Sequence, residues 1–403
     1  KSNTFPVTIR VSMLEYINDT IIIKEAGNYT IKMKQPSIDL ETVVISAGRR
    51  KQVIESVPVS MEIIRPQLID NKGISQLDDA VDQSPGVFTM DGQVSIRGGS
   101  GYSYGAGSRV LLLWNGMPLL SGYAGDTQWN AIPIEQAAQV EIMKGAASVL
   151  YGSGALNGVI AITEKQPVSK PETKIKLQSG IYGNPRRSSL KWWSRNPTFH
   201  QFELYRSKMY ERFGYTVSTA YVKDEGYREG ETTDRGRISG TFYFRPKKFD
   251  RVKAGIGYNY QYQKTGSFLL WQSDSLAYTP QKTDTSSTLG INIGHRLFID
   301  PYLTFRDKKN NKHSLKTRLY YVKNDIQNNE SQSSQAAVYF FDYQFQKQWG
   351  NGITFTSGIT DIYNSVESQL MGNHISNNIA AYGQYEHHIG KFDMIGGLRL
   401  EYF

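Results

Sequence analysis

The chain has 403 residues, which is more than one ordinary domain, and it carries 46 Lys+Arg against 37 Asp+Glu. It has no cysteine, which excludes a disulfide scaffold and a Cys-ligated zinc or iron–sulfur site. No run approaches the roughly 20 apolar residues of a transmembrane helix, and the 26 Tyr and 17 Phe indicate a folded, β-rich chain rather than disorder. The net charge of +9 is scattered in short clusters, which favours anionic lipid headgroups over nucleic acid as its counterpart.

The first 56 residues divide into two parts. Residues 1–37 predict three short strands, at 7–11, 20–23 and 29–33, which are too few to bury a core and resemble the end of a larger domain. Residues 38–56 form a polar linker around one β-prone run, residues 41–47. Such an isolated extended run either pairs with another chain or simply connects two domains, and the residues alone favour the connector.

Residues 57–168 predict a mixed α/β domain. A helix capped by Ser75 is expected to run to Asp82, with Asp78 and Asp79 solvated on its surface. Strands are expected at 94–96, 110–113 and 140–143. Between them lie glycine-rich, aromatic loops at 98–107 and 121–126, and long loops inside a compact domain are usually functional.

Residues 172–403 consist of about eleven segments in which apolar and polar residues alternate. This alternation fits a soluble β-sandwich, and it also fits an outer-membrane barrel with lipid outside and a polar lumen. Three features favour the barrel: segments of about ten residues, aromatic residues at segment ends, and connections that are alternately short and long.

No catalytic constellation is found. The sequence lacks a phosphate-binding Gly-x-x-x-x-Gly-Lys loop, a nucleophile elbow, a His-Glu-x-x-His zinc motif and an EF-hand loop. His387 and His388 are neighbours in a strand and therefore point to opposite faces. No pair of carboxylates suits a glycoside hydrolase. The chain is therefore expected to be no enzyme and to hold no cofactor or metal.

The segment Gln139–Ile162 reads as strand, glycine turn, short helix, glycine turn and strand. Together with Ser95-Ile96-Arg97-Gly98, and with Val110–Leu113 followed by Asn115-Gly116, it resembles the plug domain of TonB-dependent outer-membrane transporters. The resemblance implies a mainly β protein, with a mixed α/β plug inside an antiparallel transmembrane β-barrel. The family barrel has about 22 strands, so residues 172–403 are expected to form only its first part.

The resemblance also implies binding sites. The run at 41–47 is similar to the TonB box, the strand that pairs with the periplasmic TonB protein; its residues are Glu41, Thr42, Val43, Val44, Ile45, Ser46 and Ala47. Ligand is expected at the plug apices, where the candidate contacts are Met90, Tyr102, Tyr104, Tyr123, Asp126 and Trp129. Arg97 and Lys144 resemble the basic plug residues that pair with barrel carboxylates, although the family usually has Arg at the second position.

The function implied is active import of a scarce substrate, most readily a ferric siderophore or haem. Cobalamin or a glycan or oligopeptide is an alternative substrate, and a non-energised binding or adhesion module is an alternative function. The implied partners are TonB with its proton-driven inner-membrane motor, the ligand and outer-membrane lipid, while a surface lipoprotein is left open. Residues 1–37 resemble the end of the carboxypeptidase-regulatory-like β-sandwich domain found in Bacteroidetes-type members, which would place residues 1–56 in the periplasm.

Overall fold

The computed structural model describes residues 5–11, 19–31, 43–50, 52–54, 57–74, 76–90, 93–99, 109–123, 125, 129–246, 251–268, 270–281, 289–327, 329–350, 352–390 and 392–403. The chain forms two compact units, Lys1–Val43 and Val44–Phe403. In the first unit, β1 (Val7–Val11) and β2 (Asp19–Ile23) pair as an antiparallel hairpin. The prediction of a third strand at 29–33 is wrong for residues 29–31, which are irregular. Residues 32 and 33 lie outside the described part.

An α/β domain follows, with a five-stranded sheet in the order β5-β10-β11-β8-β9. These strands are Met61–Ile64 (β5), Val110–Trp114 (β8), Met117–Pro118 (β9), Ala137–Met143 (β10) and Gly158–Glu164 (β11). β11 pairs in parallel with β8 and antiparallel with β10. Every residue of β8 is buried, as its unbroken apolar run requires, since both faces of the sheet are covered.

Short elements complete this domain. The helices are α1 (Pro66–Asn71), α2 (Leu77–Val81) and α3 (Ser148–Tyr151), and the 3₁₀ turns include η2 (Trp129–Ala131), η3 (Ile134–Gln136) and η4 (Ser153–Ala155). β6 (Val87–Met90) and β7 (Gln93–Ile96) form a hairpin, and β3 (Val43–Val44) pairs with β4 (Gln52–Val53). The predicted strand–helix–strand order of 139–162 is confirmed. α1 was not expected, and Asp78 is half-buried rather than solvated, so burial and the neighbouring Asp79 raise its pKa.

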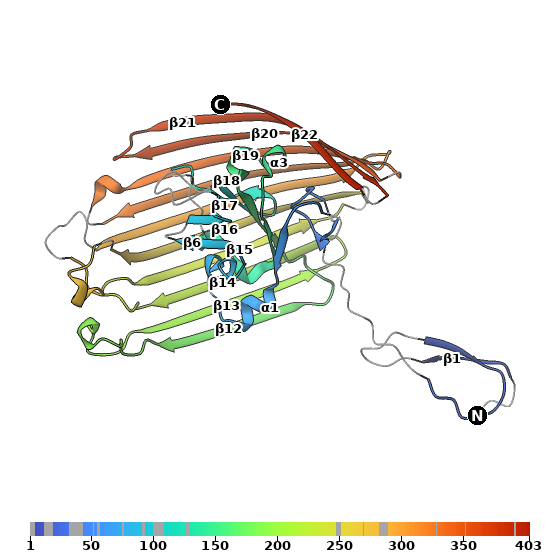
Figure 1. The fold of residues 1–403 in the computed structure, drawn as a ribbon, viewed down its shortest axis with the longest axis horizontal. Helices are drawn as coiled ribbons and strands as arrows, with labels where there is room; N and C mark the ends of the chain where they lie inside the picture. The colour runs from blue at the N-terminus through green and yellow to red at the C-terminus, as the bar shows by residue number, and fades with distance from the viewer. Residues whose placement is uncertain are drawn as a thin grey trace. The chain divides into compact units, whose positions relative to one another are not determined.

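The rest of the chain is one antiparallel sheet of eleven strands in sequence order, here called the wall (Figure 1). The strands are Glu172–Ile181 (β12), Thr198–Met209 (β13), Phe213–Asp224 (β14), Thr233–Phe244 (β15), Val252–Ser267 (β16), Gly290–Arg306 (β17), Lys312–Ile326 (β18), Ser334–Gln348 (β19), Ile353–Ser368 (β20), His374–Ile389 (β21) and Phe392–Tyr402 (β22). The prediction of about eleven strands is confirmed, although their lengths of 10 to 17 residues mostly exceed the ten expected.

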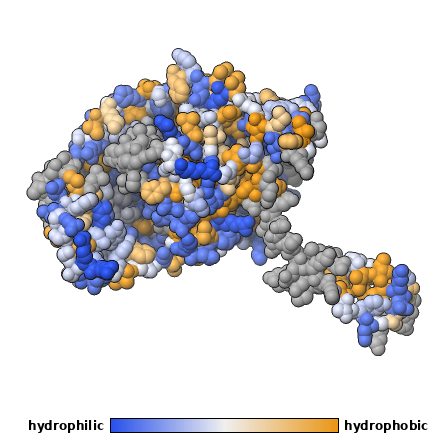
Figure 2. All heavy atoms as spheres, in the orientation of Figure 1, coloured by the Kyte–Doolittle hydropathy of each residue, from blue (hydrophilic) through white to orange (hydrophobic). Residues whose placement is uncertain are grey.

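The alternation predicted for the wall is also confirmed. In β16, Asn259 and Gln261 are fully buried on the face that meets the α/β domain, while Ile256, Tyr260 and Tyr262 are exposed on the other. A polar inner face and an apolar outer face are what a barrel in lipid requires. On the face seen in Figure 2, hydrophilic and hydrophobic side chains are intermixed.

The wall has two ends that differ in their connections. The turn end carries 210–212, 245–251, 307–311, 349–352 and 390–391; the loop end carries 182–197, 225–232, 268–289, 327–333 and 369–373. The two longest connections, 182–197 and 268–289, are both at the loop end. Within the described residues, no helix is long and apolar enough to cross a membrane.

Candidate functional site: the box segment and the interface between the α/β domain and the wall

The box segment, residues 41–47, is only partly extended. Val43 and Val44 form β3, whereas residues 45–50 turn, and Arg49 adopts a left-handed φ of 50°. The expectation of one extended run without a nearby partner is therefore corrected, because β4 lies a few residues further on and pairs with β3. Glu41 and Thr42 lie outside the described residues.

Glu141 holds the turn of the box segment. This glutamate on β10 is fully buried, and its carboxylate accepts hydrogen bonds from the backbone N–H groups of Ile45 (2.9 and 3.0 Å) and Ser46 (2.8 Å). The Ser46 hydroxyl donates a third bond to it at 2.6 Å. Tyr151 on α3 donates its hydroxyl to the Ser46 carbonyl at 2.7 Å, and burial raises the pKa of Tyr151 to about 12, so it stays a donor. A buried carboxylate thus substitutes for the partner strand that this backbone would otherwise need.

Two arginines tie the end of this turn to the wall. Arg49 donates to Asp342 of β19 and to the Tyr382 hydroxyl of β21, both at 2.8 Å, and its guanidinium stacks on the Tyr151 and Tyr382 rings. Burial opposes its charge, but Asp342 prevails and raises the pKa of Arg49 above its ordinary value. Arg50 pairs with Glu386 of β21 at 2.7 Å. The segment is therefore fastened to both the α/β domain and the wall.

The α/β domain meets the wall through buried polar contacts. Glu135 on η3 pairs with Arg237 of β15 at 2.5 Å, with both side chains almost fully buried. Glu164, at the end of β11, accepts from Thr216 of β14 (2.6 Å) and Thr241 of β15 (2.8 Å). Burial raises the pKa of Glu164 above its ordinary value. Each of these carboxylates is compensated by donors from the other layer, as a buried carboxylate must be.

Arg318 of β18 makes the most elaborate contact of this interface. It forms a double hydrogen bond with Asp300 of β17 (2.7 and 2.5 Å) and donates to the backbone carbonyls of Met117 (3.0 Å) and Pro118 (2.8 Å). Its side chain is completely buried. One guanidinium thus joins two wall strands to the β8–β9 hairpin.

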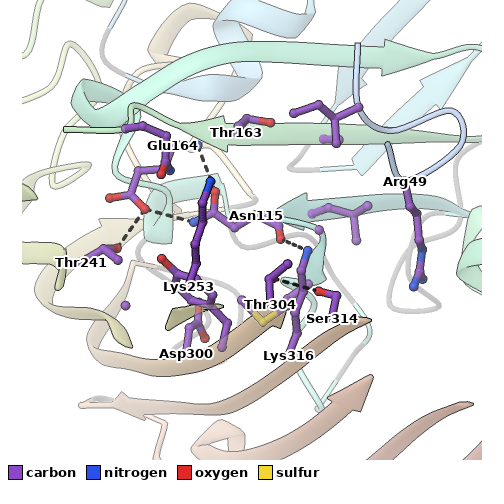
Figure 3. A pocket seen from close by; sticks show the side chains of 18 of the residues that line it. Arg49, Asn115, Thr163, Glu164, Thr241, Lys253, Asp300, Thr304, Ser314 and Lys316 are labelled. Carbon is purple, nitrogen blue, oxygen red and sulfur yellow. Dashed lines mark hydrogen bonds between the residues drawn. The ribbon is translucent and has the colours of Figure 1, made fainter. Parts of the chain in front are cut away.

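A cavity of about 380 Å³ lies between the two layers (Figure 3). The box segment contributes Ile45 and Ser46 to its lining, and Arg49 follows them. In Figure 3, Glu164 bonds Asn115 and Thr241 on one side of the cavity, and Lys316 reaches the Asn115 carbonyl on the other, at 2.6 Å. Its other lining residues include Arg245, Lys253, Thr304 and Lys312, which lie near the turn end of the wall.

The predicted ligand contacts are placed only in part. Tyr123 is half-buried and, with Gly122, lines a cavity of about 130 Å³ against Val366, His374 and Ser376 at the loop end of β20 and β21. Trp129 is 5% exposed and packs in the hydrophobic core rather than at an apex. Met90 ends β6, and its side chain is outside the described part, as are Tyr102, Tyr104 and Asp126.

Arg97 and Lys144 lie together within the α/β domain. Arg97, with a φ of 53°, donates to the Lys144 carbonyl (3.2 Å) and the Ser60 hydroxyl (2.7 Å). Lys144 pairs with Glu62 of β5 at 2.5 Å and donates to the Pro85 carbonyl at 2.8 Å. Their contacts among the described residues are thus internal to the domain, and pairing with a barrel carboxylate stays a prediction.

The residues that fasten the box segment were not predicted. In the sequence, Arg49 and Arg50 stand out only as neighbouring basic residues, and Glu141 only as one residue of the segment Gln139–Ile162. The one available signal was a glutamate in the middle of the apolar run Val140–Met143, because an unpaired carboxylate is not tolerated in a buried strand.

Comparison with known proteins identifies the α/β domain. Residues 53–159 match the TonB-dependent Receptor Plug Domain. The vitamin B12 transporter BtuB of Vibrio vulnificus is 32% identical over 160 residues, which is 38% of this chain and 25% of that protein. The iron-regulated outer membrane virulence protein of Vibrio cholerae is 28% identical over 157 residues, 36% of this chain and 23% of that protein. The chain thus matches these curated relatives over about a quarter of their length.

Solved structures show the same fold over most of the chain. The siderophore receptor PirA from Acinetobacter baumannii superposes with a TM-score of 0.66 at 15% identity, covering 85% of this chain and 56% of that one. The ferric yersiniabactin uptake receptor FyuA from Yersinia pestis gives 0.64 at 15% identity, covering 85% and 56%. The chain therefore carries a plug domain homologous to those of TonB-dependent receptors, set against part of a receptor-type β-barrel, and its homologues are transporters and receptors rather than enzymes.

Proposed function

We propose that the chain is the plug and the first strands of the barrel of a TonB-dependent transporter, which imports a scarce substrate across the outer membrane. Substrate binds at the loop end, between Tyr123, the neighbouring plug loops and the wall. The box segment at the opposite, turn end is the contact for TonB. Residues 1–37 are the end of a periplasmic regulatory-like domain, and the wall contacts outer-membrane lipid.

The fastening of the box segment by Glu141 carries this proposal. The N–H groups of Ile45 and Ser46 are both occupied by one buried carboxylate. An added strand would use one of the two, because successive N–H groups of a strand point to opposite edges. Release from Glu141 would free that donor for pairing with TonB. Because Tyr151 and Arg49 link the same turn to α3 and to β19, a shift of the plug changes the stability of the bound segment. Substrate binding and TonB pairing are thereby linked through two states of one segment.

Deletion of residues 41–47 tests the energised function. Under the proposal, cells carrying the deletion bind substrate at their surface as the parent does, but uptake falls to background. Replacement of Val43 by Pro is a milder companion, because proline removes one ladder N–H and leaves the plug intact. Uptake that survives the deletion would refute the proposal and favour a binding or adhesion module.

The substrate we propose is a ferric siderophore or haem. Superposition on siderophore receptors and similarity to an iron-regulated protein support it, while the BtuB relatives favour cobalamin as the second candidate. Abundance of the protein in outer membranes from iron-starved and iron-replete cells separates the two. Strong induction on starvation supports the first candidate. Unchanged abundance, with growth that depends on the transporter when vitamin is limiting, supports the second.

A further inference from the structure

The cavity of about 380 Å³ between the plug and the wall has more cationic than anionic side chains in its lining. Four cationic side chains line it from the wall side: Arg245 after β15, Lys253 on β16, and Lys312 and Lys316 on β18. Three carboxylates line it as well: Glu141, Glu164 and Asp300. The question is whether these carboxylates neutralise the lysines.

Each carboxylate has hydrogen-bond partners other than Arg245, Lys312 and Lys316. Glu141 accepts hydrogen bonds from the box segment, and Asp300 accepts two hydrogen bonds from Arg318. Glu164 accepts hydrogen bonds from two threonines and from Asn115. The remaining cation of the lining, Arg49, has its own partner in Asp342. Asp300 and Asp342 attract Lys316 electrostatically, but both are hydrogen-bonded to arginines. On the described walls of the cavity, Arg245, Lys312 and Lys316 therefore form no salt bridge.

Lys312 lies at the centre of this excess. It also lines a smaller cavity, of about 70 Å³, together with Arg306, Lys309 and the uncharged Asn310, Gln346 and Gln348. These cationic side chains repel one another, and a multivalent anion bound among them would be attracted by each of them. The Asn115-Gly116 turn faces them, and Gly116, at a φ of +79°, lets the Lys316 amine approach where a Cβ would lie only 2.7 Å from it.

We propose that this cavity binds a compact multivalent oxyanion, a polycarboxylate or a phosphate compound, through Lys312, Lys316 and Arg245. The volume of about 380 Å³ is at the small end of ligand pockets, so a molecule of about the size of citrate or pyrophosphate fits better than a large chelate. The site lies at the turn end, away from the loop-end cavity at Tyr123, and shares its lining with Ile45 and Ser46. It does not depend on the transport proposal, because binding is a property of the purified protein.

Calorimetric titration of the protein in detergent with citrate and with pyrophosphate, at matched ionic strength, tests the site. We expect saturable binding of one anion per chain, and at least about a tenfold loss of affinity in Lys312→Gln combined with Arg245→Gln. Lys312→Arg keeps the charge and should keep most of the affinity. A preference for citrate or for pyrophosphate identifies carboxylate or phosphate as the favoured chemistry.

The matched control is Lys308→Gln, which removes one positive charge from the exposed β17–β18 turn without touching the cavity lining. Its affinity should equal that of the parent. Absence of saturable binding, equal affinity in the double variant, or an equal loss in Lys308→Gln would each overturn the proposal. None of these results bears on the deletion of residues 41–47, so the two proposals fail separately.

Discussion

Replacing Glu141 by Gln should release the box segment while leaving the plug folded. The substitution keeps the size of the side chain and one acceptor oxygen but removes the charge. Its amide oxygen can take the place of Oε2 and still accept from Ile45 and Ser46, but without the negative charge. Its NH₂ then takes the place of Oε1 and can no longer accept from Ile45. The bound turn is weakened, whereas the pairing of β10 with β11 and β5 does not involve this side chain.

The size of the effect follows from the loss of charge at these bonds. The box segment makes three contacts with the carboxylate, from the Ile45 N–H, the Ser46 N–H and the Ser46 hydroxyl. Hydrogen bonds to a charged group contribute about 1.5–3 kcal/mol each and those to a neutral group about 0.5–1.5 kcal/mol, so about 1 kcal/mol is lost at each bond. A net loss of about 2–3 kcal/mol shifts the closed-to-released ratio about 30- to 150-fold, so a ratio of about 99:1 would fall to about 3:1 or lower.

Spin labelling measures this shift directly. The native chain has no cysteine, so Val43→Cys gives a single labelling site beside the turn. We expect a mobile spectral component to increase in Glu141→Gln, together with tighter binding of a soluble TonB domain. Glu164→Gln is the matched control, because it neutralises another buried glutamate on the neighbouring strand β11 that does not contact the box segment. An unchanged spectrum in Glu141→Gln, or an equal change in both variants, would refute the reasoning.

Three further predictions concern the plug and its contact with the wall. Arg237→Ala leaves the carboxylate of Glu135 buried without its cation, which should destabilise the contact between plug and wall by about 3–5 kcal/mol. Hydrogen exchange in residues 129–137 should become faster, and unchanged exchange would contradict the prediction. Gly116→Ala should lower the free energy of unfolding by at least about 1–2 kcal/mol, because φ of Gly116 is positive and the added Cβ would meet the Lys316 amine. In the control Gly396→Ala the added Cβ meets no atom within 4 Å, so this variant should melt as the parent does. Burial raises the pKa of Glu164, so the stability tied to its protonated form is fully present below its unfolded pKa and is lost as pH rises through the raised value. The melting temperature should therefore decline as pH rises above the ordinary pKa of a glutamate, less steeply in Glu164→Gln, and equal slopes would count against it.

The wall was predictable because its signal is local. Alternation of period two identifies which residues of a strand share a face, and the polar residues that alternate in β16 and β18 are the ones buried against the plug. Strand ends were less predictable: β17 extends through Pro301, and nothing in the residue pattern distinguishes a strand of ten residues from one of seventeen. The glycine-punctuated segment 139–162 was predictable for the same reason as the wall, since its turns and strands follow directly in the chain.

The fastening of the box segment was not predictable, because its parts are far apart in sequence. Ile45 lies 96 residues from Glu141, and Arg49 lies 293 residues from Asp342. β-propensity predicts extension for residues 41–47, and of the described residues 43–47 only Val43 and Val44 follow it. From Ile45 onward a buried carboxylate binds the backbone more strongly than a neighbouring strand would, and the chain turns.

The composition of this contact suits the switch that we propose. A box segment held by apolar packing alone would leave its backbone N–H groups without a hydrogen-bond partner when bound. Here the backbone N–H groups of Ile45 and Ser46 are satisfied in the bound state by Glu141. In the released state an added strand would satisfy one of them and water the other. The two states therefore differ by the charge-assisted part of a few hydrogen bonds, an amount that a partner strand can supply and that a small displacement of Tyr151 or Arg49 can remove.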